Sequence, residues 1–320
     1  MAPHALVNFF ITFSLRANTH KTYGSHQRTF IALCTEFNIN PSLPLSEDSL
    51  CLVVAAYASR GHKITTVPGF ISALANHALN HRLGPLPRGV RFDQLIAGLR
   101  NYYGHQNVAV PKVAFTMMDL VAFYPHFDRS TFEGARDWCA CLLAFFGLLR
   151  VGEYTDGQLR LQDVRLTSWG VSLLIPFSKT TLIPTQVDIV SRSDFLCPAR
   201  AASDYLSFFT RLSGLSLRPT NPFFISRLSS GNTPLSSVEF INRVRAVILT
   251  ALPGRDPEAY AGHSFRRGGT TALKLAGVSD SVIQQHGRWK SDAYRAYIDS
   301  DNNLNARLMA TSALNSGVLL

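Results

Sequence analysis

The sequence predicts a mostly helical protein of the α+β class, with two domains and a small antiparallel sheet in the second. Apolar residues recur at helical spacing through the first hundred positions. A stretch without helical period follows, and three short strand-like segments then stand between further helical ones. With 320 residues, of which 46% are hydrophobic, the chain has enough apolar material for two packed cores.

Residues 1–105 are predicted to form a helical first domain. The apolar residues Phe30, Ile31, Cys34 and Phe37 recur at the spacing of an α-helix. Further segments of this kind are SLCLVVAAYAS, GFISALANHAL and FDQLIAGLRNYY. This bundle of four or five short helices carries basic residues at its helix tips, namely Arg16, Lys21, Arg28, Arg60, Lys63, Arg82, Arg88, Arg91 and Arg100. The tips could hold backbone phosphates, although a solvated helix end explains any single one of them better.

Residues 114–320 are predicted to form the second, mixed domain. Gly104–Val113, ahead of it, has no helical period and contains Pro111, so it is expected to be a linker. Helices are expected around TMMDLVAFY and over Phe132–Leu149, then strands in RLQDVRL, VSLLIPF and TQVDIV. Helices return in RAASDYLSFFTRL, in SSVEFINRVRAVILTAL and from Ser264 almost to the end of the sequence.

The ionisable residues give the chain a formal net charge of +10, from 31 Lys and Arg against 21 Asp and Glu. A field of this sign attracts polyanions, such as nucleic acid or an acidic membrane surface. An incidental excess of surface arginine gives the same count. The charge therefore indicates a nucleic-acid partner only together with residues that can act on a phosphodiester.

The cysteines and the apolar runs indicate a cellular compartment. The five cysteines, an odd number without a CxxC pair, are Cys34, Cys51, Cys139, Cys141 and Cys197. Their mostly apolar neighbours indicate buried free thiols in a reducing compartment. The first residues lack the pattern of a secretory signal, and the longest apolar runs are too short to span a bilayer. We expect a soluble intracellular protein without a membrane partner, nuclear in a eukaryote and otherwise cytoplasmic.

The motif LLRVGEY places Arg150 directly after an apolar helical segment. The planar fork of an arginine can clamp two oxygens of a phosphate. Glu153 follows three residues later, close enough to orient Arg150 if the helix continues. A purely structural Arg–Glu ion pair is the alternative, and the motif alone favours it.

Lys179 stands in FSKTTLIP, in the turn between two of the predicted strands. A lysine on a hairpin can swing toward a scissile phosphate and donate a proton to the departing oxygen. By itself, Lys179 is better explained as an ordinary charged turn residue.

The motif AGHSFRRGG holds His263 and Arg266 three positions apart at a predicted helix start. Both side chains would point to one face of the helix and could meet the same phosphate. Gly268 and Gly269 follow, and their lack of a side chain allows the backbone to approach a ligand closely. Because HxxR has many chance matches, the pattern needs support from other motifs.

The motif QQHGRWKSDAYRAYI breaks a helix at Gly287 and then presents Trp289, Tyr294 and Tyr297. A tyrosine can attack phosphorus and leave a covalent phosphotyrosine. Aromatic residues at helical spacing more often belong to a core, so neither tyrosine stands out alone. Together the four motifs supply the cations, acid, base and nucleophile that a phosphoryl-transfer site needs.

The order and spacing of the four motifs resemble those in the catalytic domain of the tyrosine recombinases, also called the phage integrase family. The motifs are LLRVGE, a hairpin lysine, GHSFRRGG and GRWKSDAYRAYI. The helical first domain is similar to the core-binding domain of that family, so the resemblance covers nearly the whole chain. The form GRWKSDAYRAY is most similar to recombinases of eukaryotic mobile elements, the Crypton and DIRS groups.

The resemblance implies how a DNA phosphate is held. Arg150 and Arg266 would clamp its non-bridging oxygens, and Glu153 would be a supporting acidic residue. Trp289 would donate a hydrogen bond from its indole N–H, at the place where the family has His or Trp.

The resemblance also implies which groups react. Tyr297 would be the nucleophile and form a 3′-phosphotyrosyl link, His263 would accept its proton, and Lys179 would protonate the 5′ oxygen. Two successive transesterifications of this kind need no ATP, metal or other cofactor. The sequence agrees, since it contains neither a P-loop nor a compact acidic cluster for paired magnesium ions.

Two of these assignments have a rival. The interval from Trp289 to Tyr297 is eight residues, about one shorter than is common in the family, and by spacing alone Arg288 could take the His/Trp place. Tyr294 is the rival nucleophile, on roughly the same helical face. Tyr297 is preferred because the nucleophile of the family usually precedes an apolar residue, here Ile298.

The function implied is a site-specific DNA recombinase or integrase of a mobile element. Its partner would be double-stranded DNA with paired recognition sites, bound by a homo-oligomer that is a dimer on one site and a tetramer in the synapse. The C-terminal segment NNLNARLMATSALNS is expected to be a helix that docks on another protomer. A type IB topoisomerase and a domesticated, non-catalytic DNA-binding protein are the alternatives.

Overall fold

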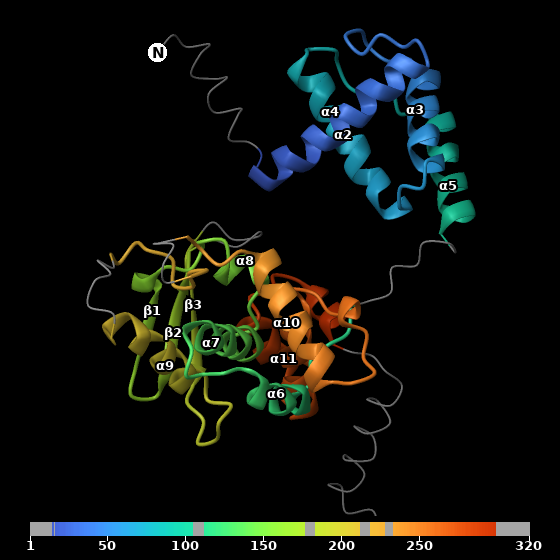
Figure 1. Cartoon of the computed structure of the whole chain (residues 1–320). Coiled ribbons are helices and arrows are strands. Elements are labelled where there is room, and N and C mark those ends of the chain that lie inside the picture. Colours follow the sequence, from blue (N-terminus) through green and yellow to red (C-terminus); the bar gives the residue numbers. More distant parts are fainter. Residues whose placement is uncertain are drawn as a thin grey trace, which may run out of the picture. The chain divides into compact units, whose positions relative to one another are not determined.

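The computed structural model describes residues 15, 17–104, 112–176, 183–211, 218–227 and 233–298 (Figure 1). The chain divides into two compact units, Met1–Val110 and Pro111–Leu320. The hairpin lysine Lys179 and the C-terminal segment 302–316 lie outside the described residues. None of the helices in the described ranges combines the length and the hydropathy that a membrane span requires.

The first unit is a helical bundle, as predicted. Its elements are α2 (Ala17–Glu36), α3 (Glu47–Ser59), the 3-10 turn η1 (Ile64–Thr66), α4 (Val67–Asn80) and α5 (Val90–Tyr103). The Ser46 side chain accepts a hydrogen bond from the backbone N–H of Ser49 and so caps α3. Apolar side chains from these four α-helices form one core, among them Phe30, Leu50, Val54, Phe70 and Leu99.

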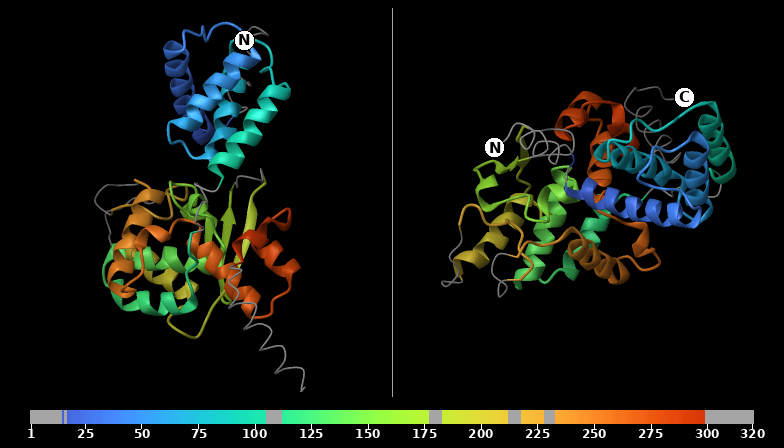
Figure 2. Two further views of the ribbon diagram at one scale, coloured as in Figure 1. Left: turned by 90° about the vertical axis from the view of Figure 1, so that its right-hand side faces the viewer. Right: turned by 90° about the horizontal axis from the view of Figure 1, so that it is seen from above.

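The second unit is mostly helical and contains one small sheet, again as predicted. Its helices are α6 (Met117–Phe123), α7 (Phe132–Phe146), α8 (Val151–Tyr154), α9 (Pro198–Arg211), α10 (Ser237–Ala251), α11 (Ser264–Leu275) and α12 (Asp280–His286). The 3-10 turns are η2 (Tyr124–His126), η3 (Leu161–Asp163), η5 (Pro257–Ala259) and η6 (Asp292–Tyr297). The helix α7 runs through the middle of this unit and contacts α9, α10 and α11 (Figure 1, Figure 2).

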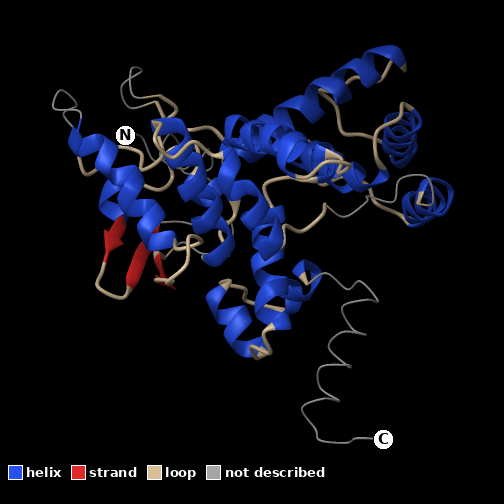
Figure 3. Ribbon diagram, turned by 60° about the horizontal axis from the view of Figure 1, so that its bottom comes forward, coloured by secondary structure: helices blue, strands red, loops and turns tan. Residues whose placement is uncertain are grey.

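The sheet lies at the edge of the second unit (Figure 3). It consists of β1 (Val164–Leu166), β2 (Gly170–Ile175) and β3 (Thr185–Val190), in that order and with antiparallel neighbours. The register pairs Val171 with Ile189, and both side chains are buried. Because α9 packs against all three strands, the sheet has one covered face, and Val171, Leu173 and Ile175 of β2 are buried.

The helix α7 is buried along most of its length and ends at a sharp turn. The sequence predicts a helix to Leu149, but α7 ends at Phe146, where Gly147 follows as the cap. Leu148 then adopts the left-handed region with a φ of 46°. The prediction was three residues too long because leucine rarely adopts this conformation, so the sequence does not mark the turn.

Gly268 and Gly269 lie in α11, which packs against α7. A side-chain carbon at Gly268 would overlap the carbonyl oxygen of Phe115, and one at Gly269 would overlap that of Phe145. The expectation that these glycines admit a ligand was wrong, because the space that a side chain would fill holds the protein's own backbone. The glycines allow α11 to pack closely.

Gly268→Ala is expected to destabilise the second unit by about 1–3 kcal/mol, because the new contact with backbone forces α11 to shift. At an open helix position the same change would be favourable by about 1 kcal/mol. Gly98→Ala in α5 is the matched control, since nothing lies within 4 Å of its new carbon. Thermal unfolding measures both variants, and equal effects would contradict the packing role of Gly268.

The stretch from Ser264 onward is broken twice within the described residues, where the sequence predicts one break at Gly287. The helix α11 is followed by Gly277, which has a φ of 77°, and α12 is followed by Gly287 and then Arg288, which has a φ of 60°. Glycine adopts this backbone region readily, whereas arginine rarely does. The second break allows η6 to pack against α11.

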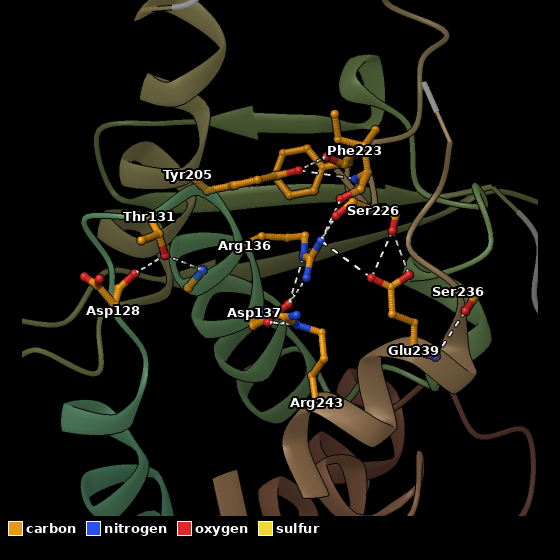
Figure 4. Close-up of polar contacts among 12 residues, drawn as sticks. Asp128, Thr131, Arg136, Asp137, Tyr205, Phe223, Ser226, Ser236, Glu239 and Arg243 are labelled. Carbon is orange, nitrogen blue, oxygen red and sulfur yellow. Dashed lines mark hydrogen bonds and ion pairs between the residues drawn. The ribbon is translucent and has the colours of Figure 1, made fainter. Parts of the chain in front are cut away.

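A buried charge network ties α7 to α10 (Figure 4). Arg136 is fully buried, and its Nε donates to Asp137 Oδ1 at 2.8 Å. Its Nη1 donates to the carbonyl oxygens of Ile225 and Ser226. Asp137 also pairs with Arg243 of α10. Figure 4 shows Arg136 pointing from α7 toward Ser226, so the network holds the segment that precedes α10 against the core.

Candidate active site

Arg150 and Glu153 meet at the start of α8. The backbone N–H of Arg150 donates to Glu153 Oε2 at 2.9 Å, and Arg150 Nη1 donates to Oε1 at 2.7 Å. The Arg150 side chain is 19% exposed and that of Glu153 is 3% exposed. The expected pair therefore forms, but at a helix start after the Leu148 turn rather than within a continuing helix.

Arg266 lies in the first turn of α11 and is fully buried. Its Nη1 donates to the carbonyl oxygen of Leu148, and its Nη2 donates to that of Gly287. The guanidinium carbon lies 4.0 Å from the ring centroid of Trp289 and 5.5 Å from that of Tyr297. Two carbonyl groups thus hold Arg266, and two aromatic rings cover it.

The hydroxyl of Tyr297 lies beside His263. Its oxygen is 3.5 Å from His263 Nδ1. His263 directly precedes α11 and is exposed, whereas Tyr297 ends η6 and is half-buried. The distance is long for a hydrogen bond, as is common for a nucleophile and its base before the substrate binds. The imidazole is placed to accept the proton of this hydroxyl.

Tyr294 is directed elsewhere. It is buried, and its hydroxyl donates to Asp280 Oδ2 at 2.9 Å. Lys274 pairs with the other oxygen of the same carboxylate at 2.5 Å. Burial and the hydrogen bond to Asp280 raise the pKa of Tyr294, which makes its phenolate harder to form. These contacts are those of a residue that fixes η6 to α12.

Arg288 and Trp289 also face different surroundings. The Trp289 ring lies against Arg266 and is 5.3 Å from the ring of Tyr297, between centroids. Arg288 turns inward, is 6% exposed, and donates from Nη2 to Glu153 Oε2 at 2.7 Å. Of the two residues considered for the His/Trp place, Trp289 is the one that contacts both Arg266 and Tyr297.

Three guanidinium groups gather around one carboxylate in this cluster. Burial alone would raise the pKa of Glu153, but Arg288 and Arg150 more than offset it, and the pKa is lowered. Burial lowers the pKa of Arg266 to about 9, and the nearby Arg150 and Arg288 add to the shift. The cluster holds more positive than negative charge, and a bound phosphate would balance it.

Comparisons with known proteins find relatives in sequence and in fold. No family model matches the chain. An integrase/recombinase XerD homolog of Selenomonas ruminantium is 26% identical over 294 residues, which cover 89% of this chain and 82% of the relative. The Tn1549 transposon integrase in complex with circular intermediate DNA has a TM-score of 0.64 at 13% identity, over 93% of this chain and 94% of that one.

Two further solved structures have a similar fold. XerH recombinase bound to a palindromic difH substrate has a TM-score of 0.63 at 16% identity, over 92% of this chain and 79% of that one. A lambda integrase dimer bound to a core site has a TM-score of 0.57 at 16% identity, over 93% and 96%. The chain has the fold of the tyrosine recombinases. The XerD homolog, similar over most of both sequences, supports a place in this family.

Most residues predicted from the resemblance to tyrosine recombinases come together in one site. They are Arg150, Glu153, His263, Arg266, Trp289 and Tyr297. The seventh, Lys179, lies outside the described residues. Among the described residues, no group of three or more His, Cys, Asp or Glu side chains could hold a metal ion.

Sequence reasoning missed two contributors to this site. One is the carbonyl group of Leu148, which accepts hydrogen bonds from both Arg266 and Arg288. A backbone acceptor leaves no trace in residue type, so no sequence signal could have found it. The other is the inward orientation of Arg288, which sequence reasoning considered only as a rival for the His/Trp place.

Proposed function

We propose that this chain is a site-specific DNA recombinase that cuts and rejoins DNA through a 3′-phosphotyrosyl intermediate at Tyr297. The observation that carries the proposal is the contact of the Tyr297 hydroxyl with His263, beside the cation-rich cluster around Arg266. The integrases and the recombinase of similar fold were solved with DNA, which supports double-stranded DNA as the substrate.

In the proposed reaction, Arg150 and Arg266 hold the non-bridging oxygens of the scissile phosphate. The oxygen of Tyr297 attacks phosphorus while His263 accepts its proton, and the 5′ oxygen leaves as a hydroxyl group with a proton from Lys179. The phosphotyrosine preserves the energy of the broken phosphodiester. Attack by the 5′ hydroxyl of a partner strand then rejoins the DNA and releases Tyr297, so ATP is not needed.

The burial of Arg266 implies a movement when DNA binds. Because the rings of Trp289 and Tyr297 cover the guanidinium, a phosphate reaches it only when the Tyr297 ring moves aside. We expect the phosphate to take this place and to receive a hydrogen bond from the Trp289 indole. Loss of either clamping arginine is expected to cost about 3 kcal/mol of transition-state stabilisation, as for an oxyanion-hole donor.

The proposal extends to the first unit, which would act as the core-binding domain. Its basic helix tips would contact backbone phosphates. Two of them, Arg60 and Arg91, form exposed ion pairs with Glu36 and Asp48. Exposed pairs of this kind contribute little stability, so DNA phosphates can replace the carboxylates at small cost.

We also propose an assembly and a cellular setting. A dimer would occupy one recognition site and a tetramer would join two sites in the synapse. The form GRWKSDAYRAY supports a mobile-element recombinase of the Crypton or DIRS kind. Such an enzyme would act in the nucleus of a eukaryotic host.

A nicked suicide duplex tests the proposed activity. A nick next to the cleavage point lets the 5′ hydroxyl fragment diffuse away, so the covalent adduct accumulates instead of being rejoined. The probe is a pool of labelled duplexes with randomised half-sites, so that it presents many candidate recognition sequences. The expected result is a labelled protein band that survives denaturing electrophoresis, and DNA binding without any such band would contradict the proposed activity.

The affinity for DNA is expected to fall steeply with salt. Neutralising phosphates with Lys and Arg releases counterions, so contact with six to ten phosphates would weaken binding by about 10³- to 10⁵-fold between 50 and 200 mM salt. Fluorescence anisotropy with a labelled duplex over this range measures the slope. An affinity that does not change with salt would contradict the phosphate contacts.

A further inference from the structure

We propose that Arg288 is a positioning residue, which keeps Arg150 and Arg266 oriented toward the scissile phosphate. This inference rests on the proposed recombinase function. It assigns Arg288 a role of its own, distinct from that of Trp289 at the His/Trp place.

Arg288 joins three parts of the second unit. It follows α12 in the left-handed backbone region, with a φ of 60°, and this conformation directs its side chain inward. Nη1 donates to the carbonyl oxygen of Gly147 at 3.2 Å, and Nη2 donates to that of Leu148 at 3.1 Å. Nη2 also donates to Glu153 Oε2 at 2.7 Å. The Arg288 guanidinium thus connects the turn after α12 with the end of α7 and the start of α8.

Arg288 controls how Glu153 pairs with Arg150. Nη1 of Arg150 donates a hydrogen bond to Oε1 of Glu153 at 2.7 Å. The other oxygen, Oε2, accepts hydrogen bonds from Arg288 and from the backbone N–H of Arg150. An arginine left alone with a carboxylate tends to bind both oxygens in a parallel, bidentate pair. Because Arg288 occupies the second oxygen, the Arg150 guanidinium keeps donors that can meet a phosphate.

Arg288 also fixes the carbonyl group that holds Arg266. The Leu148 carbonyl oxygen accepts from Nη1 of Arg266 and from Nη2 of Arg288. Leu148 is in the left-handed region, so the direction of this carbonyl depends on a backbone conformation that leucine rarely adopts. Contacts from two guanidinium groups stabilise it.

A direct contact of Arg288 with the phosphate is the alternative, and the geometry argues against it. Each terminal nitrogen of Arg288 already donates to two acceptors within the protein, which uses all four of its terminal N–H groups. Each terminal nitrogen of Arg266 donates to only one, so Arg266 keeps N–H groups for a phosphate. Arg150 is more exposed, at 19%, and donates from one of its terminal nitrogens to Glu153. The two arginines that pair with Glu153 therefore differ in role.

The test compares Arg288→Gln, Arg288→Lys, Glu153→Gln and the double variant Glu153→Gln with Arg288→Gln. Three quantities are measured for each: the affinity for DNA, the single-turnover rate of adduct formation at saturating duplex, and the thermal unfolding temperature. Arg295→Gln is the matched control, because Arg295 follows in the same segment with a side chain that is 64% exposed.

Arg288→Gln is expected to slow adduct formation on the order of 10- to 100-fold, the usual cost of a misplaced catalytic group, with unchanged DNA affinity. Arg288→Lys should recover part of the rate, since it restores a cation beside Glu153. The double variant should be faster than Arg288→Gln alone, because the carboxylate that misdirects Arg150 is gone. Arg295→Gln should behave as the wild type.

Three results would overturn the inference and leave the proposed recombinase function intact. The first is adduct formation at the wild-type rate in Arg288→Gln, and the second is a double variant whose loss of rate equals the product of the losses in the two single variants. The third is a rate of adduct formation that falls only in step with DNA affinity. Should Arg288→Gln fail to fold, Arg288→Lys and the double variant carry the same comparison. Absence of an adduct from the wild type would instead defeat the proposed function itself.

Discussion

Tyr297→Phe abolishes the covalent protein–DNA adduct and leaves DNA binding unchanged; this is the largest functional effect that we expect. Phenylalanine keeps the ring that packs on Trp289 and Arg266 but lacks the oxygen that attacks phosphorus. The wild type and the variant are compared on the same nicked duplex, with adduct formation followed on denaturing gels and affinity by anisotropy.

Tyr294→Phe is the matched control for this result. It removes a hydrogen bond to Asp280 and is expected to cost about 1 kcal/mol of stability, with the adduct retained. The opposite pattern, an adduct in Tyr297→Phe and none in Tyr294→Phe, would move the nucleophile to Tyr294.

Arg136→Ala is expected to have the largest effect on stability, a loss of about 3–5 kcal/mol, because it leaves the buried Asp137 with one cation instead of two. It also leaves the carbonyl oxygens of Ile225 and Ser226 without their guanidinium donor. Arg243→Gln removes the other cation, which is 40% exposed, and should cost less. Urea unfolding of both variants measures the difference, and a loss below 1 kcal/mol in Arg136→Ala would contradict the account of this network.

The loss in Arg136→Ala should also depend on pH. Burial already raises the pKa of Asp137 above its ordinary value, against the opposing effect of both arginines, and removal of Arg136 raises it further. A carboxyl group with a higher pKa in the folded state than in the unfolded state binds more protons when folded. The stability of the variant relative to the wild type should therefore recover as the pH is lowered from 8 toward 5.

Much of the fold could be predicted from the sequence, because helices and strands with one buried face carry the period of that face. The alternation in β2 and the helical spacing around Phe30 are examples. The end of α7 could not be predicted, since Leu148 takes a backbone conformation that tertiary contacts impose on it. The role of Gly268 was misread for a similar reason: the neighbour that excludes a side chain there is Phe115, distant in the sequence.

The candidate site was predictable where roles depend on side-chain type. Arg150, His263 and Arg266 were identified because phosphoryl transfer needs cations and a base, and the structure brings them beside Tyr297. The choice between Tyr297 and Tyr294 depends on which way each hydroxyl points, and spacing along the sequence does not show this. The Tyr297 hydroxyl lies beside His263, whereas the Tyr294 hydroxyl donates to Asp280.

Identification of the adducted peptide tests the central claim most directly. Trypsin cleaves after Lys290, Arg295 and Arg307, so Tyr294 and Tyr297 fall in different peptides, 291–295 and 296–307. The wild-type adduct is digested with trypsin and nuclease, and the peptide that carries the nucleotide remnant is identified by mass spectrometry. The account predicts the remnant on Tyr297 in peptide 296–307. A remnant on peptide 291–295, or on any residue outside these two peptides, would contradict it.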